Sequence, residues 1–218
     1  FLKRYLTPQG NGDYSLLSPE GFKKMTSYLK GGNQDGAVTY FFPNGTKEET
    51  RSKLNGVYNG EQTVYHPNGK IQKQGNYIHG YKEGKWTAYH FNGNKLWEAT
   101  YEYDVIRDSI VYYDDSGTKE KCYYYDFNGD KTKNVYYHSN GVVSSTTPFK
   151  YELVHGVLNN YSEDGKLMVS RKYNAGVIYE YSFLSEGKLL PYIPFSGTGK
   201  IEAKFDNGNN SVAFNLID

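Results

Sequence analysis

The sequence is poor in cysteine, in long apolar runs and in net charge. Its single cysteine, Cys122, has no second thiol for a disulfide or a cysteine metal site. There is no run of eighteen consecutive apolar residues, which argues against a membrane-spanning helix. Lys and Arg number 25 against 24 for Asp and Glu, so the formal charge of +1 gives little for nucleic-acid phosphates to bind. These shortages exclude several functional classes and select none.

Tyrosine and glycine are what the chain has in excess. Aromatic residues make up 17% of it, with 24 Tyr against 11 Phe and 2 Trp. Tyrosine suits surfaces that are half apolar and half wet, because the ring packs while the hydroxyl reaches water. Glycine also numbers 24, and nine of these residues follow an asparagine. Asn-Gly between alternating segments is the strongest short-range signal for a β-hairpin, because both residues accept positive φ.

The turns recur at a fixed spacing. Glycine returns every 24 residues from Gly21 to Gly165, and residues four before and eight after these glycines form two largely aromatic columns. Self-similarity at such a period is typical of a repeat architecture. The column before the glycines holds Leu17, Phe41, Tyr65, Tyr89, Tyr113, Tyr137 and Tyr161, and the column after them holds Leu29, Lys53, Tyr77, Tyr101, Tyr125, Phe149 and Tyr173.

Each repeat has the pattern of a strand, an Asn-Gly turn, a second strand and a five-residue Gly-x-x-x-Gly turn, which is clearest at residues 80–84. The turn at residues 92–93 sets the expected cross-strand partners in the best repeat. The predicted pairs are Tyr89 with Leu96, Ala88 with Trp97, and Trp86 with Ala99.

The pattern predicts an all-β fold, an elongated array of antiparallel β-hairpin repeats in a single twisted sheet with little or no helix. We expect one continuous domain, with an N-terminal cap strand over residues 1–16 and the hairpin array over residues 17–181. Degenerate half-repeats and a cap are expected over residues 182–218. An alternative for residues 22–30 is a helix capped by the preceding Ser18.

Residues 75–86, followed by Tyr89 and the Asn-Gly pair at 92–93, resemble the MORN repeat in the variant form common in bacterial proteins, including those assigned as antitoxins of toxin–antitoxin systems. The likeness is strongest over residues 61–101. This resemblance implies an all-β array that serves as a binding or scaffolding module without catalysis of its own. In eukaryotic relatives such arrays are linked to membrane phospholipids and protein partners. The Gly-x-x-x-Gly pattern is lost at residues 104–108, so a uniform groove is not expected.

A column of histidines, His66, His90 and His138, is the strongest candidate for metal chemistry. Equivalent positions lie two strands apart, about 10 Å, whereas a zinc ligand nitrogen lies about 2.0–2.1 Å from its ion. We therefore interpret the column as a solvated ladder beside the turns and expect no metal and no cofactor. The sequence also lacks a nucleophile elbow, a phosphate loop and a metalloprotease motif, so no enzyme and no catalytic residue are predicted.

The aromatic columns form the candidate binding surface. Packing alone explains either column, but two columns and two tryptophans exceed what one buried face needs. We predict a non-enzymatic interaction module that binds a protein partner through exposed Tyr and Trp. The alternative is a cell-envelope module that stacks a glycan on the aromatic ladders. The predicted partner-binding residues are Tyr65, Tyr77, Trp86, Tyr89, Trp97, Tyr101, Tyr113 and Tyr137.

The remaining expectations concern location and assembly. The chain begins at Phe1 without an initiating Met, which suggests that a secretory signal or lipoprotein anchor was removed, or that the chain was trimmed. Few cysteines and abundant Tyr, Asn and Gly favour a bacterial cell envelope or secreted location over the cytoplasm. An exposed terminal strand could pair with its symmetry mate, which predicts a weak end-to-end homodimer.

Overall fold

The computed structural model describes residues 2–4, 10–185, 187–194, 200–204 and 210–215. All regular structure in these residues is β-strand, which confirms the predicted all-β array of antiparallel hairpins. Residues 23–30 form a strand, so the helical alternative there is wrong. The chain divides into two compact units, residues 1–117 and 118–218, and each is described by itself. The predicted boundaries near residues 16 and 181 stay a prediction.

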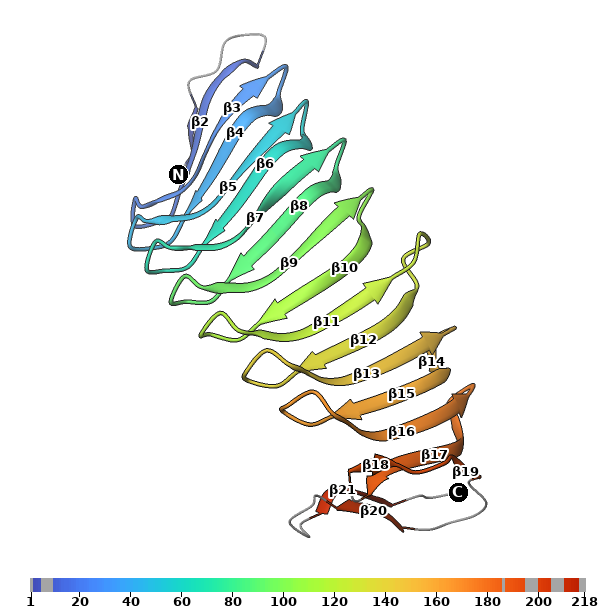
Figure 1. Ribbon diagram of the computed structural model, residues 1–218. Coiled ribbons are helices and arrows are strands. Elements are labelled where there is room, and N and C mark those ends of the chain that lie inside the picture. Colours follow the sequence, from blue (N-terminus) through green and yellow to red (C-terminus); the bar gives the residue numbers. More distant parts are fainter. Residues whose placement is uncertain (1, 5–9, 186, 195–199, 205–209, 216–218) are drawn as a thin grey trace. The chain divides into compact units, whose positions relative to one another are not determined.

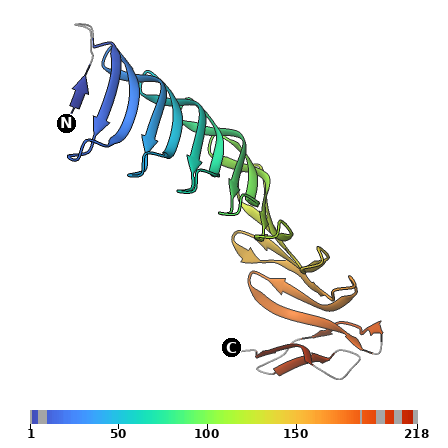
Figure 2. The ribbon, with the colours of Figure 1, turned by 90° about the vertical axis from the view of Figure 1, so that its left-hand side faces the viewer.

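Unit 1 is an open antiparallel sheet in which each strand pairs with the next along the chain. Figures 1 and 2 show these strands side by side in one layer, with the turns alternating between two edges. The strands are β1 (Leu2–Arg4), β2 (Gly12–Leu17), β3 (Lys23–Lys30), β4 (Asn33–Phe41), β5 (Lys47–Leu54), β6 (Val57–Tyr65), β7 (Ile71–Ile78), β8 (Tyr81–Tyr89), β9 (Lys95–Glu102) and β10 (Val105–Tyr113).

Unit 2 continues the same hairpin pattern with shorter and less regular strands toward its end. Successive antiparallel pairs run from β11 to β17, and β20 pairs with β21 as a separate hairpin. The predicted half-repeats over residues 182–218 fall partly outside the described residues. The strands are β11 (Lys119–Tyr125), β12 (Lys131–Tyr137), β13 (Val143–Lys150), β14 (Leu153–Val154), β15 (Gly156–Tyr161), β16 (Leu167–Asn174), β17 (Val177–Ser185), β18 (Lys188–Leu189), β19 (Ile193–Pro194), β20 (Lys200–Lys204) and β21 (Asn210–Asn215).

The repeating Asn-Gly turns are three-residue loops. At residues 66–70, the Gly69 amide donates to the His66 carbonyl at 2.8 Å, and the His66 amide donates to the Lys70 carbonyl at 2.8 Å. Gly69 has a φ of 82°, whereas Asn68 keeps the ordinary negative sign. This geometry is a β-turn closed by a glycine in the left-handed region. The expected positive φ at both turn residues is therefore wrong at this edge of the sheet.

A bulge follows each of these loops and shifts the register by one residue. Tyr89 pairs with Lys95, so the predicted pairing of Tyr89 with Leu96 is wrong. The extra residue is absorbed before the next pair, and the two strands return to the expected alignment. The predicted pairs Ala88–Trp97 and Trp86–Ala99 are confirmed.

The opposite edge carries the two-residue turns with positive φ at both positions. His79 and Gly80 have φ values of 52° and 91°, and residues 81–84 already belong to β8, with Gly84 at an irregularity of the ladder. The predicted five-residue turn over residues 80–84 is therefore wrong. Where glycine is lost, Asp104 and Asp108 adopt the same left-handed conformation, with φ values of 65° and 64°.

Hydrogen bonds between turns tie each repeat to the next. The Gly80 amide donates to the Tyr58 carbonyl at 2.8 Å, and the His79 amide donates to Asn59 Oδ1 at 3.2 Å. At the other edge, the side-chain Nδ2 of Asn68 donates to the Phe91 carbonyl at 3.1 Å. Because the same bonds recur at equivalent positions, the turns form ladders parallel to the array. Recurrences include Asn92 with Asp115 in unit 1 and Asn140 with Glu163 in unit 2.

The buried apolar residues of unit 1 lie on one face of the sheet. Trp86 is fully buried, and its indole lies directly on the backbone of Gly75, where an added Cβ would be 2.1 Å from the ring. The Trp86 Nε1 donates to the Asn76 carbonyl at 3.2 Å. Val38 and Ile110 are buried in the equivalent position of other repeats. In unit 2 the buried pair Met168 and Val169 packs against Phe183 and Leu184.

Candidate functional site

Strand residues point alternately to the two faces of the unit 1 sheet. We call the face that carries Tyr58, Tyr77, Trp86 and Tyr101 the aromatic face, because these rings contact one another. We call the opposite face the hydroxyl face. It carries a row of cross-strand partners, which are Thr39, Thr50, Thr63, Gln74, Thr87 and Glu98.

The predicted binding residues divide between these two faces. Tyr77, Trp86, Trp97 and Tyr101 lie on the aromatic face, whereas Tyr65, Tyr89 and Tyr113 lie on the hydroxyl face, and Tyr137 lies in unit 2. A single flat partner cannot contact both sets at once. Trp86 is fully buried, so the expectation of an exposed ring there is wrong, while the other seven residues are half-buried. Their role in binding stays a prediction.

The aromatic face holds a continuous row of four rings across β6 to β9. Tyr58 stacks on Tyr77 with ring centroids 5.2 Å apart, and Tyr77 meets Trp86 edge-on at 5.1 Å. Trp86 then meets Tyr101 edge-on at 6.3 Å. Edge-to-face and offset contacts at these separations are favourable, so the row is fixed by its own packing. Burial raises the pKa of the Tyr77 hydroxyl, with a further contribution from the Asp104 carboxylate.

Lysine ammonium groups lie over this row of rings. Lys53 lies 5.1 Å from the Tyr58 ring centre, and Lys73 lies 5.9 Å from Trp86. Lys82 lies 5.3 Å from Trp86 and 4.9 Å from Tyr101. A cation within about 6 Å of a ring face is attracted by the ring's charge distribution. We call the set Tyr58, Tyr77, Trp86, Tyr101, Lys53, Lys73 and Lys82 the lysine–aromatic strip.

A half-buried arginine borders the strip. The Arg51 guanidinium donates to the hydroxyls of Tyr40 and Tyr58, and its Cζ lies 4.3 Å from the Tyr40 ring centre. Glu49 lies 3.5 Å from Arg51, and Gln62 donates to the same carboxylate at 2.5 Å. Burial, followed by the charge of Arg51, lowers the pKa of the neighbouring Lys53. The positive charges of Arg51 and Lys53 together therefore exceed the negative charge of Glu49 beside them.

On the hydroxyl face, by contrast, the lysines are paired. Lys85 and Lys95 lie 2.7 Å and 3.0 Å from Glu98 Oε2, and the Tyr113 hydroxyl donates to Oε1 at 2.6 Å. Partial burial raises the pKa of Glu98, but the hydrogen bonds from Lys85, Tyr113 and Lys95 outweigh it and lower this pKa to about 2. The Glu98 carboxylate thus links β8, β9 and β10 through one ion-pair and hydrogen-bond network.

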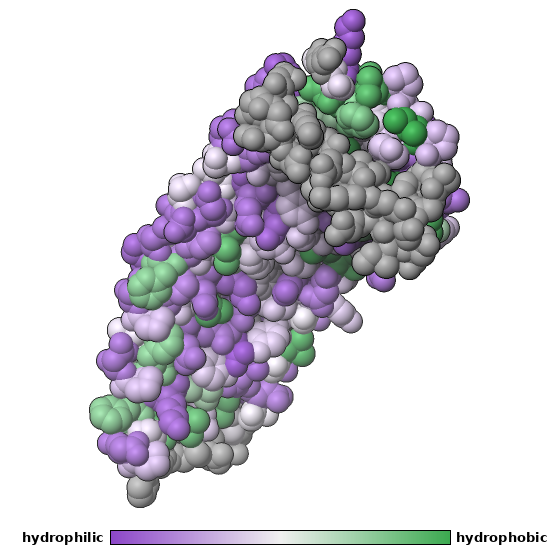
Figure 3. Space-filling model, turned by 90° about the horizontal axis from the view of Figure 1, so that it is seen from below, coloured by the Kyte–Doolittle hydropathy of each residue, from purple (hydrophilic) through white to green (hydrophobic). Residues whose placement is uncertain are grey.

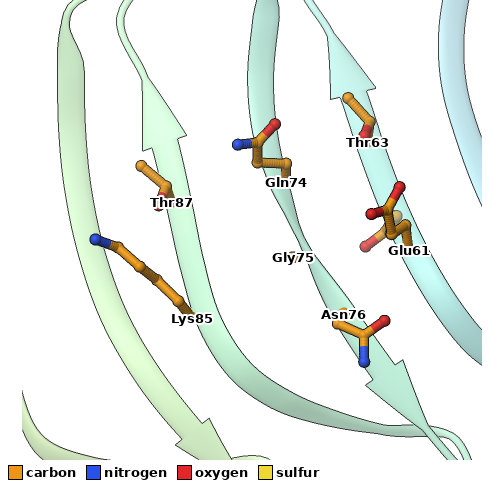
Figure 4. A pocket seen from close by; sticks show the side chains of 8 residues that line it. Glu61, Thr63, Gln74, Gly75, Asn76, Lys85 and Thr87 are labelled. Atoms are coloured by element: carbon orange, nitrogen blue, oxygen red, sulfur yellow. The ribbon is translucent and has the colours of Figure 1, made fainter.

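The hydroxyl face also has a shallow polar groove over β6, β7 and β8, with a volume of about 380 Å³. Figure 4 shows hydroxyl, amide and charged side chains from the three strands side by side along it. Such groups can donate and accept hydrogen bonds in several directions, as sugar hydroxyls and peptide groups require. The groove is lined by Glu61, Gln62, Thr63, Gln74, Gly75, Asn76, Lys85 and Thr87.

The sequence prediction missed Tyr58 and the three lysines of the strip. A signal was present, because Lys53 and Tyr58 flank one two-residue turn while Tyr77 and Lys82 flank the next. In each pair, a lysine on one strand lies opposite a tyrosine on the neighbouring strand. The wrong turn assignment at residues 80–84 hid this pattern, since it removed Lys82 from the strand.

Some exposed apolar side chains also escaped prediction. Tyr103 is 67% exposed beside a two-residue turn, and Phe91 is 59% exposed at an Asn-Gly turn. On the surface drawn in Figure 3, apolar residues form separate spots among polar ones. Binding by one broad apolar patch is therefore not indicated on that surface. In the described part of the chain, no helix has the length and hydrophobicity needed to cross a membrane.

The three histidines of the column form hydrogen bonds beside the turns. Nε2 of His66, His90 and His138 lies 3.1 Å, 3.0 Å and 2.9 Å from a carbonyl oxygen of the following repeat. These imidazoles therefore donate to backbone and join successive turns, which the expectation of a solvated ladder did not include. Among the described residues, no three His, Cys, Asp or Glu side chains are grouped to hold a metal ion. Cys122 is buried.

A comparison with protein families matches residues 58–79 to the family model for the MORN repeat variant. This segment contains β7 and most of β6, and with them Tyr58, Lys73 and Tyr77 of the lysine–aromatic strip. The resemblance to the MORN repeat is therefore confirmed. A search of the curated proteins gives no match. The chain carries a repeat of a binding or scaffold type.

Proposed function

We propose, from the MORN repeat variant at residues 58–79 and the equivalent hairpins around it, that this chain is a non-catalytic module that binds a protein partner. The partner would lie on the aromatic face of unit 1. The observation that carries this proposal is the lysine–aromatic strip, where half-buried rings and lysines form one row across β5 to β9.

Aromatic and cationic groups are the usual anchors of protein interfaces, because they combine a large apolar area with directional polar contacts. The strip offers both, and its rings are held in place before a partner arrives. A partner then orders few side chains on binding, which keeps the entropic cost low. The burial of Trp86 gives it a supporting role, in which it fixes the positions of Tyr77, Tyr101 and Lys82.

Glycan binding is a second candidate function, and it belongs to the other face. The polar groove of Thr63, Gln74, Asn76, Lys85 and Thr87 suits sugar hydroxyls, whereas the rings on the aromatic face contact one another and leave no spaced set of free ring faces. The two functions can therefore be separated by substitutions on opposite faces of the same strands.

The test is an affinity capture from lysate and from the envelope fraction of the source cell, read by mass spectrometry. Tyr101→Ala alters the aromatic face, and Thr63→Ala alters the hydroxyl face of the same sheet. Both variants are first checked for an intact fold by circular dichroism. Under the proposal, one protein is captured in stoichiometric amount and is lost with Tyr101→Ala but kept with Thr63→Ala.

The opposite result overturns the proposal. If no protein is captured and the chain is retained on insoluble cell-wall material in a way that depends on Thr63, the glycan-binding function takes its place. A protein whose capture depends on neither face would also contradict a site on the aromatic face.

A further inference from the structure

The three lysines of the lysine–aromatic strip form no ion pair with any described carboxylate. Their ammonium groups lie over the rings of Tyr58, Trp86 and Tyr101. Lys53 also lies near the charges of Arg51 and Glu49, and the backbone amide of Lys82 donates to Asp104 Oδ1 at 2.7 Å. Two carboxylates lie beside the strip: Glu49 already binds Arg51 and Gln62, and Asp104 accepts a hydrogen bond from the Lys82 backbone amide. Arg51 and the three lysines outnumber Glu49 and Asp104, so a surplus of about two positive charges lies beside the rings.

The hydroxyl face of the same strands shows that this surplus belongs to one face only. There Lys85 and Lys95 share the carboxylate of Glu98. Lys82 and Lys85 lie on the same strand, β8. Within the described residues the Lys85 ammonium pairs with Glu98, whereas Lys82 meets the Asp104 carboxylate through its backbone amide and not through its ammonium. The unmatched cations are concentrated where the rings are.

We infer that the lysine–aromatic strip is the docking site for an acidic, extended segment of a partner protein, whose carboxylates bind Lys53, Lys73 and Lys82. The inference rests on the proposed function and names the chemistry of its partner. Charge complementarity carries it, because the cations of the strip outnumber the carboxylates beside them and the three ammonium groups form no ion pair with a described carboxylate.

The spacing of the lysines fits an extended peptide laid across the strands. Lys53 lies on β5 and Lys82 on β8, so three strand spacings, about 14 Å, separate their strands. In an extended chain, side chains on one face recur about every 6.6 Å, so acidic residues at alternate positions of a five-residue stretch span about 13 Å. Two carboxylates at i and i+4 thus match Lys53 and Lys82, while Lys73 lies four residues along β7 from Tyr77, the cross-strand partner of Lys82.

The rings prepare these lysines for a carboxylate. A lysine held over a ring has already lost part of its side-chain freedom, so less is lost when an anion binds. Burial and the charge of Arg51 lower the pKa of Lys53 more than the Glu49 carboxylate raises it, and a further carboxylate from a partner would act in the same direction as Glu49. The residues of the partner segment that alternate with its acidic residues face away from the lysines, so the strip does not restrict their type.

The test uses the whole chain and a fluorescent ten-residue peptide of alternating Glu and Ser, with binding measured by anisotropy at about 50 mM and about 300 mM salt. A peptide of alternating Gln and Ser is the uncharged probe. The double variant Lys73→Gln/Lys82→Gln removes two charges from the aromatic face. Its matched control, Lys85→Gln/Lys95→Gln, removes two charges from the hydroxyl face.

We expect the Glu-Ser peptide to bind and the Gln-Ser peptide not to bind. The aromatic-face variant should weaken binding by about five- to tenfold, the control by less than about twofold, and the higher salt by about tenfold. Equal losses in both variants would show attraction to overall charge and would overturn the inference. So would absence of Glu-Ser binding, or binding of vesicles containing phosphatidylserine at the same lysines without peptide binding.

Failure of this inference can be told apart from failure of the proposed function. If a protein is captured through Tyr101 but the Glu-Ser peptide does not bind, and Lys73→Gln/Lys82→Gln leaves capture unchanged, the partner is not acidic and the interaction module stands. If neither the protein capture nor the peptide binding depends on the aromatic face, both fail together.

Discussion

At the scale of single residues, the contact between Gly75 and Trp86 is the tightest packing constraint in unit 1. A methyl group on residue 75 would lie 2.1 Å from the indole, while its φ is in the ordinary negative range. We expect Gly75→Ala to lower the free energy of unfolding by about 1–3 kcal/mol through overpacking alone. Urea unfolding followed by tryptophan fluorescence measures this loss.

The control for this prediction is a double-mutant cycle. Trp86→Ala alone should cost about 3–5 kcal/mol, as expected for a fully buried ring. In the Trp86→Ala background, Gly75→Ala should then cost less than about 1 kcal/mol, because the indole is gone. A Gly75→Ala penalty that persists without the indole would show that the glycine is required for another reason.

The ion-pair network of Glu98 predicts how the free energy of unfolding depends on pH. Its pKa of about 2 lies below the ordinary value of 4.5, so its contribution to stability is complete above about pH 5 and is lost as the pH falls toward 2. Glu98→Gln lacks this contribution. We expect the variant to be less stable than the natural chain by about 1 kcal/mol at pH 7, a value reduced for solvent screening, and equally stable near pH 2.

Unfolding titrations between pH 7 and pH 2 provide the measurement, with Glu61→Gln as the matched control. Glu61 also lies on the hydroxyl face, but it has no ion pair among the described residues. Its substitution should leave the pH profile nearly unchanged. A constant difference between Glu98→Gln and the natural chain across the whole pH range would contradict the role of the carboxylate.

At the scale of elements, the two-residue turns predict a stabilising substitution in unit 2. Glu152 is exposed and has a φ of 64°, where a residue with a Cβ is strained by about 1–2 kcal/mol. Glycine occupies the equivalent position in Gly80 and Gly176. We therefore expect Glu152→Gly to raise the free energy of unfolding of unit 2 by about 1 kcal/mol, measured by denaturant unfolding.

The matched control for the turn is Glu163→Gly. Glu163 is also exposed and lies in a turn, but its φ is negative. Glycine there relieves no strain and adds freedom to the unfolded chain, so about 0.5–1 kcal/mol of stability should be lost. Equal effects of the two substitutions would mean that the left-handed conformation at residue 152 is not strained.

The fold could be predicted from the sequence because glycine spacing and strand alternation act locally. The 24-residue step located every hairpin from β4 to β10, and the pairs of Trp86 with Ala99 and of Ala88 with Trp97 were predicted correctly. The bulges were not predictable in the same way. A bulge depends on how a loop closes, and one extra residue, as beside Tyr89, changes the register without changing the residue pattern.

The candidate site was harder to predict for a related reason. The face to which a ring points depends on every bulge between it and its neighbours, so the columns of Tyr77 and Tyr89 could not be assigned to opposite faces from spacing alone. The surroundings of Trp86 include rings and a lysine from two other strands, β7 and β9. Such contacts between strands cannot be recognised from the residue type at any single position of the repeat.

At the scale of the whole molecule, each of the two units has buried residues of its own. Trp86 lies in unit 1, and Val169, which is 1% exposed, lies in unit 2. In repeat proteins stability is approximately a sum of terms for each repeat and its nearest neighbours, so damage decays with distance along the array. The effect of a buried substitution should therefore be greatest in its own unit.

Hydrogen exchange with mass spectrometry tests this decay with a reciprocal pair of variants. Trp86→Ala should raise amide exchange most in β6 to β9 and least in β15 to β17, while Val169→Ala should do the reverse. Each variant thus serves as the control for the other. An equal rise in both units from either variant would instead require that the chain unfolds as one cooperative body. The lysine–aromatic strip would then depend on the stability of unit 2 as well as of unit 1, and Val169→Ala would weaken binding as strongly as a substitution beside the strip.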